Sequence, residues 1–262
     1  MPRANRYFIP GYTWHITHRC HKQEFLLKFV RDRKKWISWL YEAKKRFGLA
    51  VLNYTVTSNH IHLLVRDTGK DVIPQSMQLI AGKVAQQYNQ RKKRRGAFWE
   101  DRYHATAVDA GEHLFRCLVY IDMNMVRAGV AKHPHSWATC GYHEIQNPRD
   151  RYGIIDHDSL VNSLGFHSVP ELQKQHRQWI DEALYENTLA REAKWSQSIA
   201  VGSEAFVSQF VDTVNPVISK GKTTMVGESF VVREPLIAYS AHSGSKMGLL
   251  SHQNTFPWNL SL

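Results

Sequence analysis

The chain has 262 residues, of which 43% are hydrophobic and 11% aromatic, a composition that excludes a wholly disordered protein. Three scattered cysteines are too few for a disulfide framework. The formal charge of +11 is concentrated, because residues 1–110 hold 21 Lys/Arg against 8 Asp/Glu, whereas residues 111–262 hold 13 against 15. This asymmetry indicates a polyanionic partner, with nucleic acid first. We expect no membrane segment and a cytoplasmic protein, because neither a signal-peptide core nor a long apolar run is found.

Hydrophobic periodicity predicts alternating strands and helices through the first half of the chain. Runs rich in β-branched and aromatic residues alternate between apolar and polar positions, which is typical of strands. Other stretches repeat apolar residues every three or four positions, which is typical of amphipathic helices. In chain order we expect a strand at 12–19, a helix at 27–47, a two-stranded hairpin at 49–65, a helix at 74–92, a strand at 98–108 and a helix at 112–129.

The second strand of this hairpin carries a pair of histidines, His60 and His62. Because side chains alternate along a strand, both imidazoles lie on one face. Ile61, Leu63 and Val65 lie on the other face, which the first helix is expected to cover. Two imidazoles on an otherwise apolar strand are costly to bury unless something binds them, most commonly a divalent metal. The segment alone leaves two readings open, a metal site or two histidines on a solvated sheet face.

Four further potential ligands, His15, His18, Cys20 and His21, lie near the end of the first strand. Their spacing matches no common zinc pattern, and strand alternation sends their side chains to different faces. We therefore interpret this stretch as a strand that runs into a polar loop, without a second metal site.

The helix at 74–92 ends in a run of five consecutive basic residues, which precedes two aromatic residues, Phe98 and Trp99. A basic run with aromatic neighbours is typical of a surface that contacts nucleic acid. A solvated charged loop is the alternative, but the concentration of positive charge in this part of the chain favours phosphate contact. Arg102 is a further candidate phosphate ligand. The five residues of the run are Arg91, Lys92, Lys93, Arg94 and Arg95.

The helix expected at 112–129 places Tyr120 and Asn124 four residues apart, which is one turn apart on the same face. The amide oxygen of Asn124 is a hard ligand for a metal that histidines also hold. Within reach of that metal, the Tyr120 phenol is a covalent nucleophile if its proton is removed or its target phosphate polarised. A tyrosine in such a helix is more often part of the hydrophobic core, so a purely structural role for Tyr120 is the alternative.

These motifs, taken in their order along the chain, resemble those of a known family. His60-Ile61-His62 matches the His-hydrophobe-His motif of HUH endonucleases. The run YIDMNMVRAG at 120–129 resembles the helix that carries the single catalytic tyrosine of the REP-associated tyrosine transposases. These proteins are relatives of insertion-sequence transposases that cut and join single-stranded DNA. The resemblance covers residues 5–145 and departs at Met125, where many relatives have a proline that would bend the helix.

The resemblance implies an α+β fold with a central antiparallel sheet and packed helices, a ferredoxin-like or RRM-like core, and a helical C-terminal extension. We expect a catalytic domain at 1–150, a helical accessory region at 151–215 and a loosely ordered tail at 216–262, which is rich in Ser, Gly, Thr and Lys. Both a monomer and a homodimer fit the resemblance, as does a cytoplasmic, nucleoid-associated location.

The resemblance also implies a chemistry and a partner. Tyr120 would form a 5′-phosphotyrosine link, and His60, His62 and Asn124 would hold Mg²⁺ or Mn²⁺. The substrate would be single-stranded DNA that contains a hairpin. Two alternatives are a non-catalytic DNA- or RNA-binding regulator that retains the fold and a metal-dependent nuclease without a tyrosine intermediate. The residues expected to bind the DNA are Arg19, Arg91, Lys92, Lys93, Arg94, Arg95 and Arg102.

Overall fold

A single mixed sheet runs through the protein, as seen in the computed structural model, which describes residues 8–186, 190, 192–218 and 222–233. The strand order is β2-β3-β1-β4-β5-β7-β6, and every neighbouring pair is antiparallel except β4 and β5. Within these residues no helix is both long enough and apolar enough to cross a membrane. The strands are β1 (Thr13–Arg19), β2 (Ala50–Val56), β3 (His60–Arg66), β4 (His104–Val108), β5 (Ala200–Gly202), β6 (Lys222–Val226) and β7 (Ser229–Arg233).

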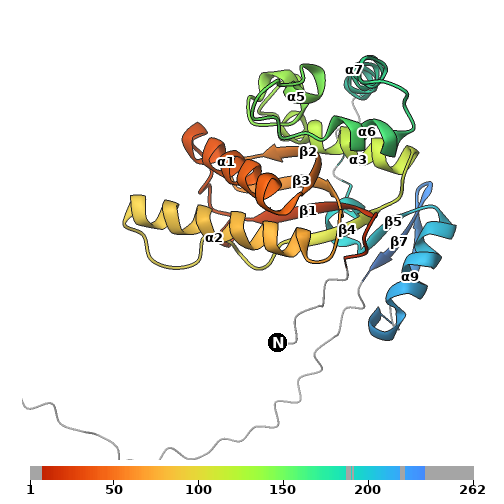
Figure 1. Ribbon diagram of the computed structural model, residues 1–262, viewed down its shortest axis with the longest axis horizontal. Helices are drawn as coiled ribbons and strands as arrows, with labels where there is room; N and C mark the ends of the chain where they lie inside the picture. Colours follow the sequence, from red (N-terminus) through yellow and green to blue (C-terminus); the bar gives the residue numbers. More distant parts are fainter. Residues whose placement is uncertain (1–7, 187–189, 191, 219–221, 234–262) are drawn as a thin grey trace, which may run out of the picture.

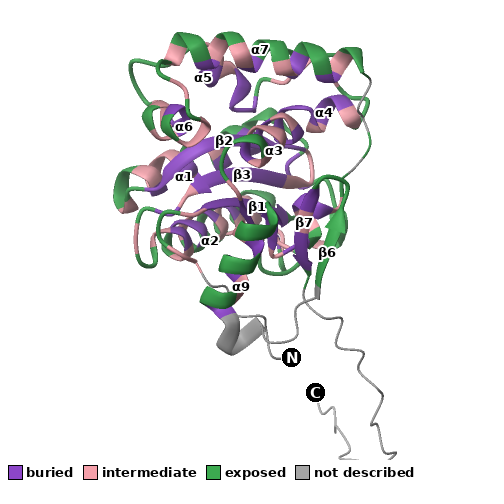
Figure 2. Cartoon of the chain, turned by 90° about the vertical axis from the view of Figure 1, so that its right-hand side faces the viewer, coloured by how far each residue is buried: buried purple, intermediate pink, exposed green. Residues whose placement is uncertain are grey.

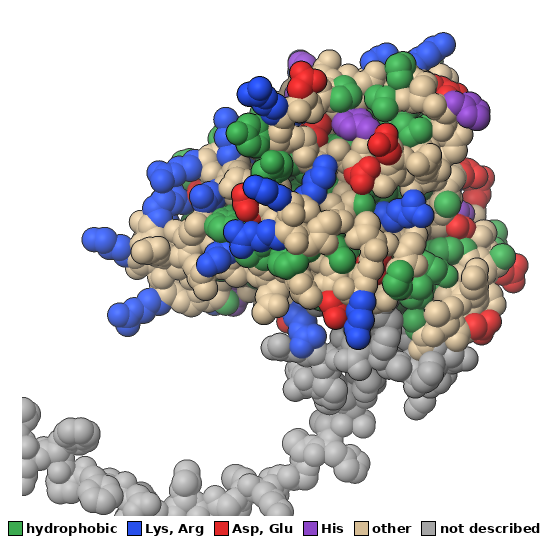
Figure 3. Space-filling view, in the orientation of Figure 1, with side chains coloured by type: hydrophobic (Ala, Val, Ile, Leu, Met, Phe, Trp, Pro, Cys, Tyr) green, Lys and Arg blue, Asp and Glu red, His purple; other side chains and the backbone are tan. Residues whose placement is uncertain are grey.

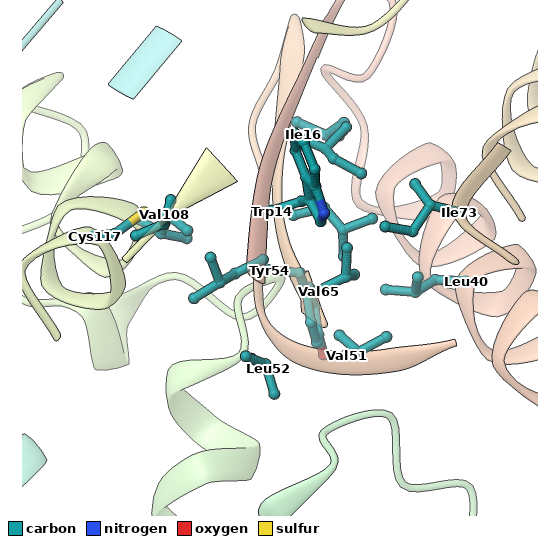
Figure 4. Packing of buried hydrophobic residues seen from close by; sticks show 14 of the residues in the cluster. Trp14, Ile16, Leu40, Val51, Leu52, Tyr54, Val65, Ile73, Val108 and Cys117 are labelled. Carbon is teal, nitrogen blue, oxygen red and sulfur yellow. The ribbon is translucent and has the colours of Figure 1, made fainter. Parts of the chain in front are cut away.

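Helices cover both faces of the sheet (Figure 1). Leu40 of α1 and Ile73 of α2 lie on one side of the central strands, and Cys117 of α3 lies on the other (Figure 4). The α-helices are α1 (Val30–Phe47), α2 (Val72–Lys92), α3 (Glu112–Asp122), α4 (Asn124–Arg127), α5 (Tyr142–Gln146), α6 (His157–Leu164), α7 (Val169–Tyr185), α8 (Lys194–Gln197) and α9 (Glu204–Ile218). Two 3-10 turns are η1 (His21–Gln23) and η2 (Pro134–Ser136).

The first six major elements form the expected ferredoxin-like core. They follow one another as β1-α1-β2-β3-α2-β4, and their strands lie in the order β2-β3-β1-β4. All pairs within these four strands are antiparallel. The α+β class and the central antiparallel sheet are therefore confirmed.

Strand β3 lies between two neighbours, and its alternation separates an apolar face from a histidine face. Ile61, Leu63 and Val65 are fully buried in the main hydrophobic core, on the face that α1 and α2 cover, as expected. Burial of each such side chain contributes about 1.5–3 kcal/mol to folding. The same alternation turns His60 and His62 to the opposite face, so the packing of the core fixes where the two imidazoles lie.

The helix expected at 112–129 is interrupted at Met123, so α3 ends at Asp122 and α4 begins at Asn124. In an unbroken helix the carbonyl of Tyr120 would accept the backbone N–H of Asn124. Here that carbonyl accepts a hydrogen bond from Arg127 Nη2 at 2.6 Å. The two helical pieces still place the side chains of Tyr120 and Asn124 on one side.

The accessory helices α5, α6 and α7 form a layer beyond β2 and α3 (Figure 2). A buried pair links α7 to the end of α3, because His176 Nε2 lies 2.8 Å from Asp122 Oδ2. Asn53 of β2 donates through Nδ2 to the other carboxylate oxygen of Asp122 at 3.0 Å. This polar network anchors α3, which carries Tyr120, to both the sheet and the accessory layer.

Two sequence expectations about strands were wrong. The strand expected at 98–108 is confined to 104–108, because Trp99 forms only an isolated bridge with Cys20 and the chain bends at 100–102 before β4. The loosely ordered tail expected from residue 216 instead contains β6 and β7, which pair as a hairpin and join the sheet through β5. Gly227, with a φ of +60°, lies in the turn, and β-branched residues flank it. The positions 234–262 of that expected tail lie outside the described residues.

Candidate active site

A pocket of about 360 Å³ lies on the histidine face of the sheet. It contains the paired histidines of β3, the tyrosine of α3 and the asparagine of α4, which the sequence predicted to converge. The predicted convergence is therefore present, while the chemical role of each residue stays a prediction. The lining residues are Thr17, Arg19, Gln23, Asn59, His60, His62, Tyr120, Asn124, Arg127, Ala128 and Ser196.

Hydrogen bonds fix the ring orientation of His60. Asn59 Nδ2 donates to the carbonyl of Gln23, so its Oδ1 is the acceptor that faces His60. His60 Nδ1 lies 2.8 Å from that Oδ1 and 3.0 Å from Thr57 Oγ1. A neutral His60 therefore carries its proton on Nδ1, and its Nε2 keeps a lone pair.

His62 is 3% exposed, and both of its ring nitrogens have a partner. Its Nε2 lies 2.9 Å from Asn124 Nδ2, which is a donor, and its Nδ1 lies 2.9 Å from His15 Nε2. Burial lowers the pKa of His62 well below its usual value, and the nearby His60, His15 and Arg127 lower it further. His62 is thus neutral near pH 7, the form in which imidazole binds a metal.

The Tyr120 side chain is 5% exposed and is held between charged and aromatic groups. The guanidinium carbon of Arg127 lies 4.0 Å from its ring centroid, within cation–π range. Its ring is nearly perpendicular to that of His62, at a centroid distance of 5.9 Å, and the Trp195 ring of α8 lies 6.1 Å away. These contacts restrict the phenol to one orientation at the pocket wall.

The pocket favours anions, because the described lining residues include Arg19 and Arg127 but neither aspartate nor glutamate. Burial lowers the pKa of the Arg127 guanidinium, and the adjacent Tyr120 opposes that change. A phosphodiester that enters the pocket would therefore meet positive charge and hydrogen-bond donors without a competing carboxylate.

The predicted DNA-binding residues fall into two groups. Arg19 lines the pocket, whereas the basic run and Arg102 lie outside its lining. Within the run, Arg91 forms an ion pair with Asp32, and Arg94 lies 3.5 Å from Glu24. Lys and Arg side chains gather over the region of α1 and α2 in Figure 3. The exposed cations among the predicted set are Arg19, Arg91, Lys92, Lys93, Arg95 and Arg102.

Three pocket neighbours were missed by sequence reasoning. His15 was assigned to an ordinary strand, but it is fully buried and bonded to His62. Arg127 lies inside the YIDMNMVRAG run, so its place one turn after Asn124 could have revealed it. Trp195 carries no sequence signal that connects it to residues some seventy positions earlier. Its contact with Tyr120 arises only because α8 packs beside β1 and β4.

The fold and the pocket together define a class of protein. It is an α+β protein in which two histidines of a strand and a tyrosine of a helix line one pocket that favours anions. Residues 9–124 match the family model described as "Transposase IS200 like". This segment includes His60, His62, Tyr120 and Asn124, and the match confirms the transposase resemblance read from the sequence. It supports a DNA transposase or endonuclease as the class of activity.

Comparison with solved structures gives more distant likenesses. One is the structure of a REP-associated tyrosine transposase bound to a REP hairpin, with 20% identity over 55% of this chain and 84% of that one, and a TM-score of 0.47. Another is a candidate transposase from Deinococcus radiodurans R1, with 16% identity over 44% of this chain and 92% of that one, and a TM-score of 0.33. At these values neither likeness informs the activity. No curated protein matches the chain.

Proposed function

We propose that the protein cleaves and rejoins single-stranded DNA beside hairpins, through a covalent link between Tyr120 and a 5′ phosphate. The observation that carries this proposal is the composition of one pocket. A phenol, two imidazoles and an amide line it beside two arginines, with no carboxylate among the described lining residues. Attack by a phenol on a phosphodiester needs this combination of nucleophile and positive surroundings.

The donor set of the pocket fits a divalent metal. Neutral His60 presents an Nε2 lone pair. The lone pair of His62 Nε2 accepts from Asn124 Nδ2, a hydrogen bond that a metal would replace when the amide turns its oxygen toward it. Two imidazoles and an amide oxygen form a mixed nitrogen and oxygen set of the kind that Mn²⁺ accepts, and Mg²⁺ with additional waters. These three residues would hold the metal, which when bound supplies charge that polarises the scissile phosphate.

The proposed step conserves atoms and charge without an external energy source. Tyr120 Oη forms a bond to phosphorus, and the bond from phosphorus to the 3′ oxygen breaks. The phenolic proton is lost and the departing oxygen gains one, which gives a free 3′-hydroxyl and a 5′-phosphotyrosine. Attack by another 3′-hydroxyl on this link reverses the step and joins a new strand. Arg19 and Arg127 would hold the non-bridging oxygens of the phosphate.

One chain supplies the complete site. Tyr120 lies in the same pocket as the histidines of its own β3, so the proposal needs no residue from a second subunit. Cleavage in cis by a monomer is therefore the form of the reaction that the pocket supports best.

Incubation with labelled hairpin-containing single-stranded DNA and Mn²⁺ tests the proposal. We expect a protein–DNA adduct that survives denaturation, together with a released strand that ends in a 3′-hydroxyl. Cleavage without an adduct would instead support a metal-dependent nuclease without a tyrosine intermediate. Binding without cleavage would support a non-catalytic regulator, and either outcome would contradict the proposal.

Replacement of Arg127 by methionine is expected to slow cleavage about a hundredfold, the typical cost of losing one group that stabilises developing charge. Methionine keeps an unbranched apolar stem beside the Tyr120 ring but removes the cation. Single-turnover cleavage at saturating DNA would show the effect. Arg127→Lys should recover part of the lost rate because it restores the charge, and equal rates for both variants would exclude an electrostatic role.

Exposed basic residues outside the pocket are expected to bind the DNA backbone. Arg95→Ala and Arg102→Ala should weaken DNA affinity and reduce the slope of log affinity against log salt by roughly 0.7–0.9 for each phosphate that the variant no longer neutralises. Arg177→Ala provides a matched control, because Arg177 is an exposed arginine on α7 in the accessory layer. Equal salt slopes in all three variants would rule out the predicted phosphate binding.

A further inference from the structure

His15 and His62 form a stacked pair across adjacent strands. Their ring centroids are 5.1 Å apart and their planes differ by 8°. β1 and β3 pair so that Thr17 lies opposite His62, which places His15 at the diagonal position on the same face. His15 Nδ1 lies 2.8 Å from the carbonyl oxygen of Trp195 in α8. A continuous chain of hydrogen bonds thus runs from α8 through β1 to the pocket.

The carbonyl at one end of this chain fixes the position of every proton along it. A carbonyl oxygen can only accept, so His15 Nδ1 must carry the proton and donate to Trp195. The His15 ring is fully buried and its two nitrogens face uncharged partners, a carbonyl and an imidazole, so it is held neutral and its Nε2 has a lone pair. That lone pair accepts the Nδ1–H of His62. Neutral His62 then has no proton on Nε2, in agreement with the donor Nδ2 of Asn124 at that atom.

We propose that His15 is a positioning residue that holds His62 in the Nδ1–H tautomer, and that α8 anchors it through the Trp195 carbonyl. A metal-binding histidine usually donates its other ring N–H to a carboxylate or carbonyl, which sets its tautomer and orientation. Here His15 accepts that hydrogen bond in place of a carboxylate or carbonyl, and His15 is itself held by the Trp195 carbonyl. The role of this tautomer in metal binding rests on the proposed function. The tautomer itself can be measured without DNA or metal.

The proposal gives the C-terminal extension a part in the active site. α8 lies well beyond residues 9–124, the segment that matches the transposase family. The Thr106 hydroxyl of β4 donates to the Ser198 carbonyl at 2.6 Å and also lies 3.3 Å from the Trp195 carbonyl, and so holds this backbone in place. Trp195 also packs beside the Tyr120 ring, and Ser196 lines the pocket. One short helix therefore contacts both the nucleophile and the histidine relay.

Nitrogen-15 NMR of the metal-free protein near pH 7 tests the tautomer directly. Long-range couplings from the ring carbon protons distinguish a protonated Nδ1 from a protonated Nε2. We expect His62 in the Nδ1–H form and His15 in the Nδ1–H form as well. A His62 ring protonated on Nε2, or an equal mixture of the two forms, would overturn the proposal. This measurement uses the unchanged protein, so its result does not depend on whether any variant folds.

A matched pair of variants separates positioning from simple space filling. His15→Leu removes the acceptor for His62, and we expect mixed His62 tautomers and a dissociation constant for Mn²⁺ that rises about 10–100-fold. His15→Gln places a side-chain oxygen where it accepts the same bond, so it should keep the Nδ1–H tautomer and an affinity within about threefold of the unchanged protein. Thermal unfolding would be recorded for both variants. Equal loss of affinity in both, or no loss in either, would contradict a positioning role.

The two readouts also separate this inference from the proposed function. If the unchanged protein binds no Mn²⁺, the metal-dependent reaction fails, while the NMR spectrum still decides whether His15 sets the His62 tautomer. If DNA is cleaved but His62 is protonated on Nε2, the inference about His15 fails and the proposed function stands.

Discussion

Replacement of Tyr120 by phenylalanine is expected to remove the covalent adduct and to reduce strand cleavage by about 10⁴-fold or more, the scale seen when a covalent nucleophile is lost. The change deletes one oxygen and keeps the ring that lies against Arg127, His62 and Trp195. The fold and the pocket wall should therefore be preserved. Gel-based cleavage assays on labelled hairpin DNA would measure the loss.

Binding measurements are the control for Tyr120→Phe. The hydroxyl is not among the three groups proposed to hold the metal, so the affinity for Mn²⁺ and for uncut DNA should change little. If cleavage persists at a rate near that of the unchanged protein, Tyr120 is a structural residue and another nucleophile, such as water, performs the attack.

Substitution of the paired histidines is the second change with a large expected effect. His60→Ala and His62→Ala should each weaken Mn²⁺ binding at least a hundredfold and reduce cleavage to background, because each removes one of the two imidazoles among the described residues that line the pocket. Isothermal titration with Mn²⁺ and cleavage over a range of Mn²⁺ concentrations would measure both effects. A rate that recovers at high Mn²⁺ in the His60→Ala protein would still agree with a ligand role.

The two histidine variants differ in their structural risk. His60 is partly exposed, so alanine there leaves the core unchanged, whereas His62 is buried and bonded to His15. His135→Ala is a matched control, because His135 is an exposed histidine outside the pocket lining. Normal Mn²⁺ affinity in His60→Ala would contradict the proposed metal site.

Local periodicity was sufficient to predict the parts of the site that lie within single elements. Strand alternation predicted that His60 and His62 share a face, and the core residues Ile61 and Leu63 confirm the opposite face as buried. The four-residue spacing of Tyr120 and Asn124 placed them together, although the helix breaks at Met123 between them. The predicted convergence did not depend on an unbroken helix, because Met123 keeps a right-handed helical conformation with φ of −72° and ψ of −1°.

Neighbours brought together by tertiary packing could not be predicted from the sequence. The pairing of His15 with His62 depends on the register between β1 and β3, which no local pattern specifies. The packing of Trp195 beside Tyr120 depends on the docking of α8 after a long accessory region. The hairpin of β6 and β7 was not predicted, because a composition rich in serine, glycine, threonine and lysine favoured a loosely ordered tail. A glycine turn between β-branched residues, which this segment also has, is typical of a hairpin.

The most direct test of the central claim is to identify the amino acid and the DNA end that are joined in the adduct. Trypsin would release residues 117–127 as one peptide, which contains Tyr120 as its single tyrosine. The pocket predicts that mass spectrometry finds this peptide linked through Tyr120 to the 5′ phosphate of the strand downstream of the cut. A link to another tyrosine, or a link through a 3′ phosphate, would contradict the account.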